Sequence, residues 1–446
     1  MRRSKYLFFA LTASALALAA VPASAGVAVK TTRVSVNSTG ASGNPCSGCS
    51  SNLPISISAT GRFVAFSDNA PNLVKGDRNF RYDIFVHDQV RGETTRVSLS
   101  SAGGEANDDS GFPAISANGR FVAFASLASN LVPGDTNHRF DVFVRDRKRA
   151  TTTRVSVSST GAEADDGSVW RPAISADGRF VAFESASTNL VPNDHNGIRD
   201  VFVRDLKRGE TTRVSVSSSG TEQISGNGAE ELGTIPAISA NGRFVAFSSR
   251  GKNLVEGDRN DTDDIFLRDR KRGVTTRVSV SSTGAEANDT SLFYPSISAN
   301  GRFVAFTSWA SNLVAGDKNG HAEDVFVRDR KRGLTTRIRE SDVNRGLYSG
   351  IPSISDNGRF VAFESPAPDL VQGDRNHAVD VFLRDRKRGK TTLLSVSSEG
   401  EQGNSESSFP AISANGRFVA FSSLASNLVG GDRHNTADTF VRGPLC

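Results

Sequence analysis

The hydrophobic pattern of this chain is a short alternation that returns at a nearly constant interval. The hexapeptide Gly-Arg-Phe-Val-Ala-Phe occurs seven times, and each copy is followed, after a polar loop, by a run similar to Asp-Val-Phe-Val-Arg. The copies begin at Gly61, Gly119, Gly178, Gly242, Gly301, Gly358 and Gly416. Self-similarity at a fixed period indicates supersecondary units that bury their apolar faces on one another. One repeated unit should therefore fill most of the chain.

Each repeat has the composition of four strands. In the second copy, residues 113–116, 120–124, 141–145 and 151–157 alternate and are rich in β-branched and aromatic residues. Asn118-Gly119 favours a tight turn between the first two segments, and a polar loop separates the second from the third. No stretch after residue 25 has a helical period with caps. Four antiparallel strands per repeat predict a propeller blade.

The two ends of the chain predict a closed ring. The last copy stops after its third strand, residues 438–442, and the missing fourth strand occurs at residues 31–36. Pairing the two removes the sheet edges that an open array would leave. We therefore predict an all-β fold: a seven-bladed β-propeller of four-stranded antiparallel blades, closed by an N-terminal strand that joins the last blade. Residues 26–446 should form this single domain.

The repeat resembles a known family. Pro-Ala-Ile-Ser-Ala-Asn-Gly-Arg-Phe-Val-Ala-Phe from Pro113, followed by Asp-Val-Phe-Val-Arg-Asp from Asp141, looks like the WD40-like repeat of TolB-type propellers. The resemblance implies the propeller fold over roughly residues 31–442. TolB carries an N-terminal α/β domain before six blades, and nothing here corresponds to that domain. Because propellers host many activities, the resemblance implies the fold more strongly than the function.

The N-terminus has the pattern of an export signal. Arg2, Arg3 and Lys5 precede an apolar stretch over residues 6–20, and Ala23-Ser24-Ala25 provides small residues for cleavage. The apolar run is too short to span a membrane, so residues 1–25 are predicted to be a signal peptide. Sec and twin-arginine export both remain open. We expect an exported protein, periplasmic or extracellular, with no transmembrane segment.

Cysteine usage agrees with that compartment. Cys46 and Cys49 form a Cys-Ser-Gly-Cys sequence, and Cys446 is the last residue. Such a pair can be a redox motif or half of a zinc site, but no second cysteine or histidine pair completes a zinc set. A small structural disulfide between Cys46 and Cys49 is the favoured interpretation, because disulfides persist outside the cytosol.

The charge is close to balanced but unevenly distributed. The formal net charge is +5, from 53 basic and 48 acidic residues. The turn after strand three is basic in most blades, as in Arg145-Asp-Arg-Lys-Arg149, whereas the long loops on the other face are rich in Asp and Asn. Pairing of these cations with the interleaved Asp is favoured over a site for an anionic cell-wall polymer. Nucleic acid is not an expected partner.

Each long loop contains Asp-x-Asn followed by a second Asp, typified by Asp135, Asn137 and Asp141. Alternating oxygen ligands are typical of calcium loops, but three side chains fall short of six to eight ligands and there is no bidentate Glu. The favoured alternative is an Asx turn in which the last Asp accepts bonds from amides at the start of strand three. Calcium therefore remains an alternative, and no other cofactor is expected.

Candidate binding residues are those that break the repeat. We find no Gly-x-Ser-x-Gly, no His-Glu-x-x-His and no phosphate-binding Gly loop, so no catalytic residue is assigned. Trp and Tyr do not follow the repeat, and the residue before each strand-one Pro should ring the channel mouth on the long-loop face. Together these give Trp170, Arg171, Tyr294, Trp309, Tyr82, Tyr348, Phe112 and Phe409 as candidates. They either bind a ligand or plug the channel.

The pattern as a whole favours a binding protein. We expect an exported, monomeric, non-enzymatic propeller that engages a protein or peptide at the long-loop face. One alternative is a secreted enzyme acting on glycans or peptides. Another is a cell-wall polymer binder that uses the basic face.

Overall fold

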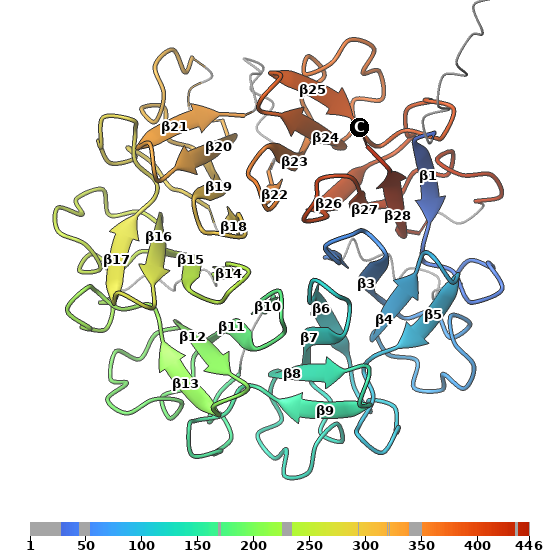
Figure 1. Cartoon of the computed structure of the whole chain (residues 1–446), viewed down its shortest axis with the longest axis horizontal. Coiled ribbons are helices and arrows are strands. Elements are labelled where there is room, and N and C mark those ends of the chain that lie inside the picture. Colours follow the sequence, from blue (N-terminus) through green and yellow to red (C-terminus); the bar gives the residue numbers. More distant parts are fainter. Residues whose placement is uncertain are drawn as a thin grey trace, which may run out of the picture.

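The computed structural model describes residues 28–43, 54–167, 171–224, 234–292, 294–318, 320, 322–338, 350–432 and 436–445. These residues form seven separate four-stranded antiparallel sheets arranged as blades around a central axis (Figure 1). The predicted seven-bladed propeller is therefore confirmed.

The blades follow the chain in order, and the labelled first strands, β6, β10, β14, β18, β22 and β26, lie innermost in Figure 1. Blade 1 contains β2 (Ser56–Ile57), β3 (Phe63–Asp68), β4 (Asp83–Asp88) and β5 (Glu93–Arg96). Blade 2 contains β6 (Ser110–Ile115), β7 (Phe121–Ser126), β8 (Asp141–Asp146) and β9 (Thr151–Arg154). Blade 3 contains β10 (Ala173–Ile174), β11 (Phe180–Ser185), β12 (Asp200–Asp205) and β13 (Glu210–Arg213). Blade 4 contains β14 (Ala237–Ile238), β15 (Phe244–Ser249), β16 (Asp264–Asp269) and β17 (Val274–Arg277).

Blade 5 contains β18 (Ser296–Ile297), β19 (Phe303–Ser308), β20 (Asp324–Asp329) and β21 (Leu334–Arg337). Blade 6 contains β22 (Ser353–Ile354), β23 (Phe360–Ser365), β24 (Asp380–Asp385) and β25 (Lys390–Leu393). Blade 7 contains β26 (Ser407–Ile412), β27 (Val419–Ser423), β28 (Asp438–Gly443) and, from the other end of the chain, β1 (Lys30–Arg33).

Strand β1 closes the ring as predicted. It pairs antiparallel with β28, with Lys30 opposite Gly443 and Arg33 opposite Phe440. A side chain of β1 also contacts the preceding blade, since the Thr31 hydroxyl donates to the Val396 carbonyl of blade 6 at 2.6 Å. Both chain ends therefore contribute to one sheet, and the edge of β28 is covered.

The fourth strands are shorter than predicted. In blade 2 the strand ends at Arg154 instead of residue 157. Beyond it the chain turns into a small hairpin, in which Val157 pairs with Glu163 in an isolated bridge. Val155 and Ala164 are buried by this turn. The Val155 amide still donates to the Val142 carbonyl of β8 at 2.7 Å, so the chain leaves strand three only after Val155.

The repeated Phe residues form the core, as expected. In blade 2, Phe124 and Phe143 are fully buried with ring centroids 5.8 Å apart. They pack with Ala65, Ile84 and Val86 of blade 1, so each core cluster spans two neighbouring blades. No described residue belongs to a helix long and apolar enough to cross a membrane.

The basic turns are held differently from the predicted pairing. Asp146 accepts a two-pronged bond from Arg120, with Nε–Oδ1 at 2.9 Å and Nη2–Oδ2 at 2.6 Å. Arg147 instead lies 5.0 Å from the ring centroid of Phe63 in blade 1 and donates to the Gly119 carbonyl. The expectation that the turn arginines pair with the interleaved Asp is therefore wrong for Arg147, because stacking on a neighbouring blade holds it.

Candidate functional site

The central channel is formed by the first strand of every blade. Its cavity of about 280 Å³ is lined by Pro-Ala-Ile or Pro-Ser-Ile segments in blades 2–7 and by residues 55–57 (Ile-Ser-Ile) in blade 1. Strands one and two are antiparallel, so in blade 2 Ser110 at the start of β6 lies opposite Ser126 at the end of β7. The start of strand one and the long loop after strand two therefore share one face, as the sequence predicted.

The predicted ring of residues at the channel mouth is only partly formed. Arg171 and Tyr294 line the channel, together with Ile235 and Ile351. In blades 2 and 7 the wall begins instead at Pro113 and Pro410.

Phe112 and Phe409 lie on β-bulges just before those prolines. The register of β6 against β7 shifts between Gly111 and Ala114, and that of β26 against β27 shifts between Ser408 and Ala411. Phe112 and Phe409 have positive φ values of 58° and 53°, which L-residues rarely adopt. Such bulges redirect a side chain and concentrate beside functional sites.

One contact joins residues from blades 3 and 7. The guanidinium of Arg171 lies 5.3 Å from the centroid of the Phe409 ring, within the range of a cation–π interaction. The Phe409 amide donates to Oε2 of Glu364 in blade 6 at 2.7 Å. Glu364 therefore holds the strained residue that Arg171 contacts.

Burial perturbs the titration of this cluster. It raises the pKa of Glu364 to about 7, against the opposing effects of bonds from the Phe409 and Ile351 amides and the charge of Arg171. Burial also lowers the pKa of Arg171 to about 10, although Tyr294 and Glu364 oppose the change. The pKa of Tyr294 is raised, mainly by burial. Groups with perturbed pKa values that converge at a cleft identify a candidate functional site.

The acidic residue of this site, Glu364, was not predicted from the sequence. Glu364 occupies the position after the repeated Phe-Val-Ala-Phe, where most blades carry Ser, Ala or Thr. The same position in blade 3 is Glu184, whose Oε1 accepts the amide of Thr234 in blade 4 at 3.1 Å. In blade 5, the Thr307 hydroxyl donates to the Gly350 carbonyl. In these three blades the residue at this position hydrogen-bonds the segment that leads into the next blade. The replacement of Ser, Ala or Thr by Glu at this position could have identified Glu364 from the sequence.

The other candidates lie away from the channel wall or outside the described residues. Tyr82 directly precedes β4, and its amide donates to Oδ1 of Asp109 at 2.9 Å. Trp309 directly follows β19, and its amide donates to the Thr290 carbonyl at 2.9 Å. Both side chains are half-buried. Trp170, Tyr348, Cys46, Cys49 and Cys446 lie outside the described residues.

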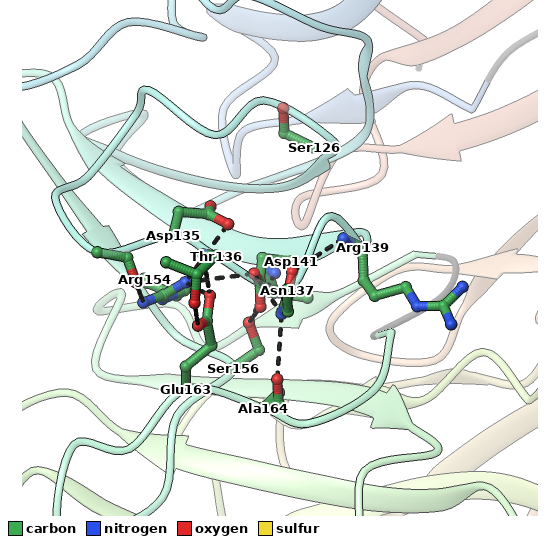
Figure 2. Close-up of polar contacts among 12 residues, drawn as sticks. Ser126, Asp135, Thr136, Asn137, Arg139, Asp141, Arg154, Ser156, Glu163 and Ala164 are labelled. Atoms are coloured by element: carbon green, nitrogen blue, oxygen red, sulfur yellow. Dashed lines mark hydrogen bonds and ion pairs between the residues drawn. The ribbon is translucent and has the colours of Figure 1, made fainter.

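The long loops contain a second repeated arrangement, shown for blade 2 in Figure 2. The side-chain Nδ2 of Asn137 donates to Oδ2 of Asp141 at 3.1 Å. Oδ1 of Asn137 accepts a hydrogen bond from the backbone amide of Arg139 at 2.8 Å. Ser156 donates to Oδ1 of Asp141. The Asx turn is confirmed. The expected amide partners of Asp141 were wrong, since its bonds come from side chains, and the Val142 amide donates to the Ser156 hydroxyl instead.

The carboxylates of this loop also gather around an arginine. Ligand oxygens of Asp135, Asp141 and Glu163 lie within 4.8 Å of one another, a grouping that could hold a metal ion. The Arg154 guanidinium contacts all three carboxylates. Burial nevertheless raises the pKa of Asp135 to about 6, helped by the charge of Asp141. Neither Arg154 nor Glu163 was among the residues predicted for this site.

Comparison with solved structures places the chain among β-propellers. It is similar to an oligogalacturonate lyase from Vibrio parahaemolyticus (TM-score 0.53, 10% identity, 94% of each chain covered) and to an oligogalacturonate lyase in complex with manganese (TM-score 0.52, 11% identity, 88% of this chain and 90% of that one). TolB from Acinetobacter baumannii is also similar (TM-score 0.42, 18% identity, 79% and 67% covered). No family model matches the chain, and no curated protein matches it in sequence.

Proposed function

We propose that this chain is an exported binding propeller that engages a protein or peptide partner at the channel mouth on its long-loop face. The observation that carries the proposal is the contact between Arg171 and Phe409, which come from blades 3 and 7. Aromatic and arginine side chains in a partly desolvated recess are the usual anchors of an interface. Removal of residues 1–25 on export, to the periplasm or outside the cell, forms part of the proposal.

The strain at Phe409 supports a role beyond packing. A non-glycine residue at positive φ costs on the order of 1–3 kcal/mol and persists only when its surroundings hold it there. The bond from its amide to Glu364 does this. The resulting recess offers a partner one guanidinium, one phenol and one aromatic ring.

An enzyme acting on glycans is the second candidate. The observation in its favour is Glu364, whose pKa near 7 suits a general acid or base, close to Arg171 and Tyr294. The similar oligogalacturonate lyases are enzymes on the same fold. Turnover of polyuronides that is lost in Glu364→Gln would favour this candidate over pure binding.

We infer that arginines, and not calcium, neutralise the long-loop carboxylates. The guanidinium of Arg154 lies where an ion would have to sit in blade 2, and Arg277 contacts Asp258, Asp264 and Glu286 in the same way in blade 4. If the chain binds an anionic polymer instead, Lys148 and Arg149, which are exposed on the opposite face, are the candidate contacts.

The binding proposal is tested by co-purification. Immobilised wild-type chain is mixed with the extracytoplasmic fraction of the source cells, beside Arg171→Ala/Tyr294→Ala and a control on the other face, Lys148→Ser/Arg149→Ser. A partner retained by the wild type and the control but lost by the channel-mouth variant supports the proposal. Loss only in the control would move the site to the basic face.

A further inference from the structure

A groove lies on the outer rim of blade 6. It has a cavity of about 740 Å³ and lies between the long loop, strand β25 and the hairpin that follows. Its lining includes Val371, Gly373, Leu393, Val396 and Gln402.

The groove lies where other blades place an arginine. Strand four ends in arginine in six blades: Arg33, Arg96, Arg154, Arg213, Arg277 and Arg337. In blade 2, Nη2 of Arg154 donates to the long-loop carbonyl of Gly134 at 2.9 Å. The corresponding residues of blade 6 are Leu393 and Gly373, and both line the groove. Leu393 has no guanidinium to bond that carbonyl.

The carboxylates that hold the arginine elsewhere are still present. In blade 1, Nη1 of Arg96 lies 3.3 Å from Asp77, 3.1 Å from Asp83 and 2.9 Å from Glu105. Blade 6 keeps the two aspartates, as Asp374 and Asp380, but replaces the glutamate by a glutamine.

This glutamine, Gln402, takes over part of the arginine's bonding. Its Nε2 donates to Asp374 at 2.8 Å and to Asp380 at 2.9 Å. Relative to blades 1–4, where the cluster contains two Asp, one Glu and one Arg, one positive and one negative charge are lost together. The blade-6 cluster therefore keeps the formal charge of those four clusters without a cation of its own.

We propose that this groove binds an arginine side chain from a partner polypeptide, with its guanidinium in the place that Arg96 occupies in blade 1. The two aspartates and the Gly373 carbonyl would accept its N–H groups, while the Gln402 amide turns toward solvent. The apolar side chains of Val371 and Leu393 would cover the methylene stem of the arginine. The groove lies on the outer rim and is independent of the channel mouth.

Two cations on the rim of the groove, Arg375 and Lys390, do not oppose this assignment. Blade 1 has Arg78 at the position of Arg375, and the Arg78 amide bonds Glu105 at 3.3 Å much as the Arg375 amide bonds Gln402 at 2.9 Å. Blade 7 has Lys30 at the position of Lys390. Both of those blades hold a guanidinium in the cluster.

The repeat supplies variants that close or copy the groove. Leu393→Arg/Gln402→Glu rebuilds the blade-1 residues in blade 6 and should fill the groove without harming the fold. Arg96→Leu/Glu105→Gln transfers the blade-6 residues to blade 1 and should open a second groove. The probe is the tripeptide Gly-Arg-Gly with a photoreactive diazirine on its N-terminus, and mass spectrometry locates the label.

The wild type should be labelled within residues 371–404, and the closing variant should lose that labelling by about tenfold or more. The opening variant should keep it and gain label at the corresponding part of blade 1, residues 74–107. The blade-6 label within the same molecule shows that this variant is folded. Equal labelling by a citrulline peptide, unchanged labelling of the closing variant, or no new label in the opening variant would each overturn the proposal.

Discussion

Gly119 of blade 2 lies flat against the ring of Phe63 in blade 1, so closely that a β-carbon at this glycine would overlap the ring. The same relationship recurs around the ring, for example between Gly178 and Phe121. It explains why the repeat begins with glycine: the residue has φ of +73° and also forms a contact surface between blades.

Gly119→Ala should therefore destabilise the chain more than its backbone conformation alone requires. Gly134 is the matched control, because its φ is +70° but nothing lies within 4 Å of a β-carbon there. We expect Gly134→Ala to cost about 1 kcal/mol and Gly119→Ala to cost a further 1–3 kcal/mol, roughly the penalty for overpacking. Denaturant unfolding measures both. Equal costs would show that the contact with Phe63 is not tight.

Removal of strand β1 should open the ring. Without residues 30–36, β28 loses its partner and presents an unpaired edge. We expect a broad, non-cooperative melt and aggregation in light scattering. A truncation that stops at residue 29 keeps β1 and should melt like the full chain. A monomeric, cooperatively melting chain without β1 would contradict the closure.

Stability should rise as the pH falls from 8 to 5. Burial raises the pKa of Asp68 to about 7, and that of Asp194 to about 6. A carboxyl with a raised pKa in the folded state contributes stability that is complete below its unfolded pKa and is lost as the pH rises through its folded pKa.

The opposite sign applies to Asp146, whose pKa the Arg120 guanidinium lowers, so stability should fall again below about pH 4. Asp68→Ser introduces the residue found at this position in the other six blades, and it should reduce the change of melting temperature between pH 5 and pH 8. An unchanged pH profile would show that Asp68 does not titrate in this range.

Calcium should leave the melting temperature of the wild type unchanged, because Arg154 already neutralises the carboxylates of blade 2. Arg154→Leu frees Asp135, Asp141 and Glu163, and this variant should gain stability with added calcium. Glu163→Gln in the same background should abolish the gain. A calcium-dependent rise in the wild type would show that the ion binds beside the arginine or displaces it.

The sequence predicted the blades and their closure because both are local or periodic features. Alternation identified strands two and three, and the seven copies showed where one blade lacked a strand. The fourth strands end earlier than predicted because the chain turns after Val155, whose amide still bonds strand three, and Val157 pairs with Glu163 of the following hairpin.

The sites were predicted less completely because they join distant parts of the chain. Arg171 was identified by its departure from the repeat. Its contact with Phe409 depends on the β-bulge in β26, which was not predicted from the local sequence. Arg154 and Glu163 lie in parts of the repeat outside the Asp-x-Asn motif, so the motif alone suggested a metal. Alignment of the repeats could have shown that Leu393 and Gln402 replace the arginine and glutamate found at these positions in blades 1–4.

The most direct test of the proposed function compares the affinity of a partner, once identified, for three forms of the chain by isothermal titration. Arg171→Ala/Tyr294→Ala should weaken binding by about 2 kcal/mol or more, with little change in melting temperature. Lys148→Ser/Arg149→Ser should bind like the wild type. Wild-type affinity in the channel-mouth variant, with binding lost in the variant of the opposite face, would contradict the account.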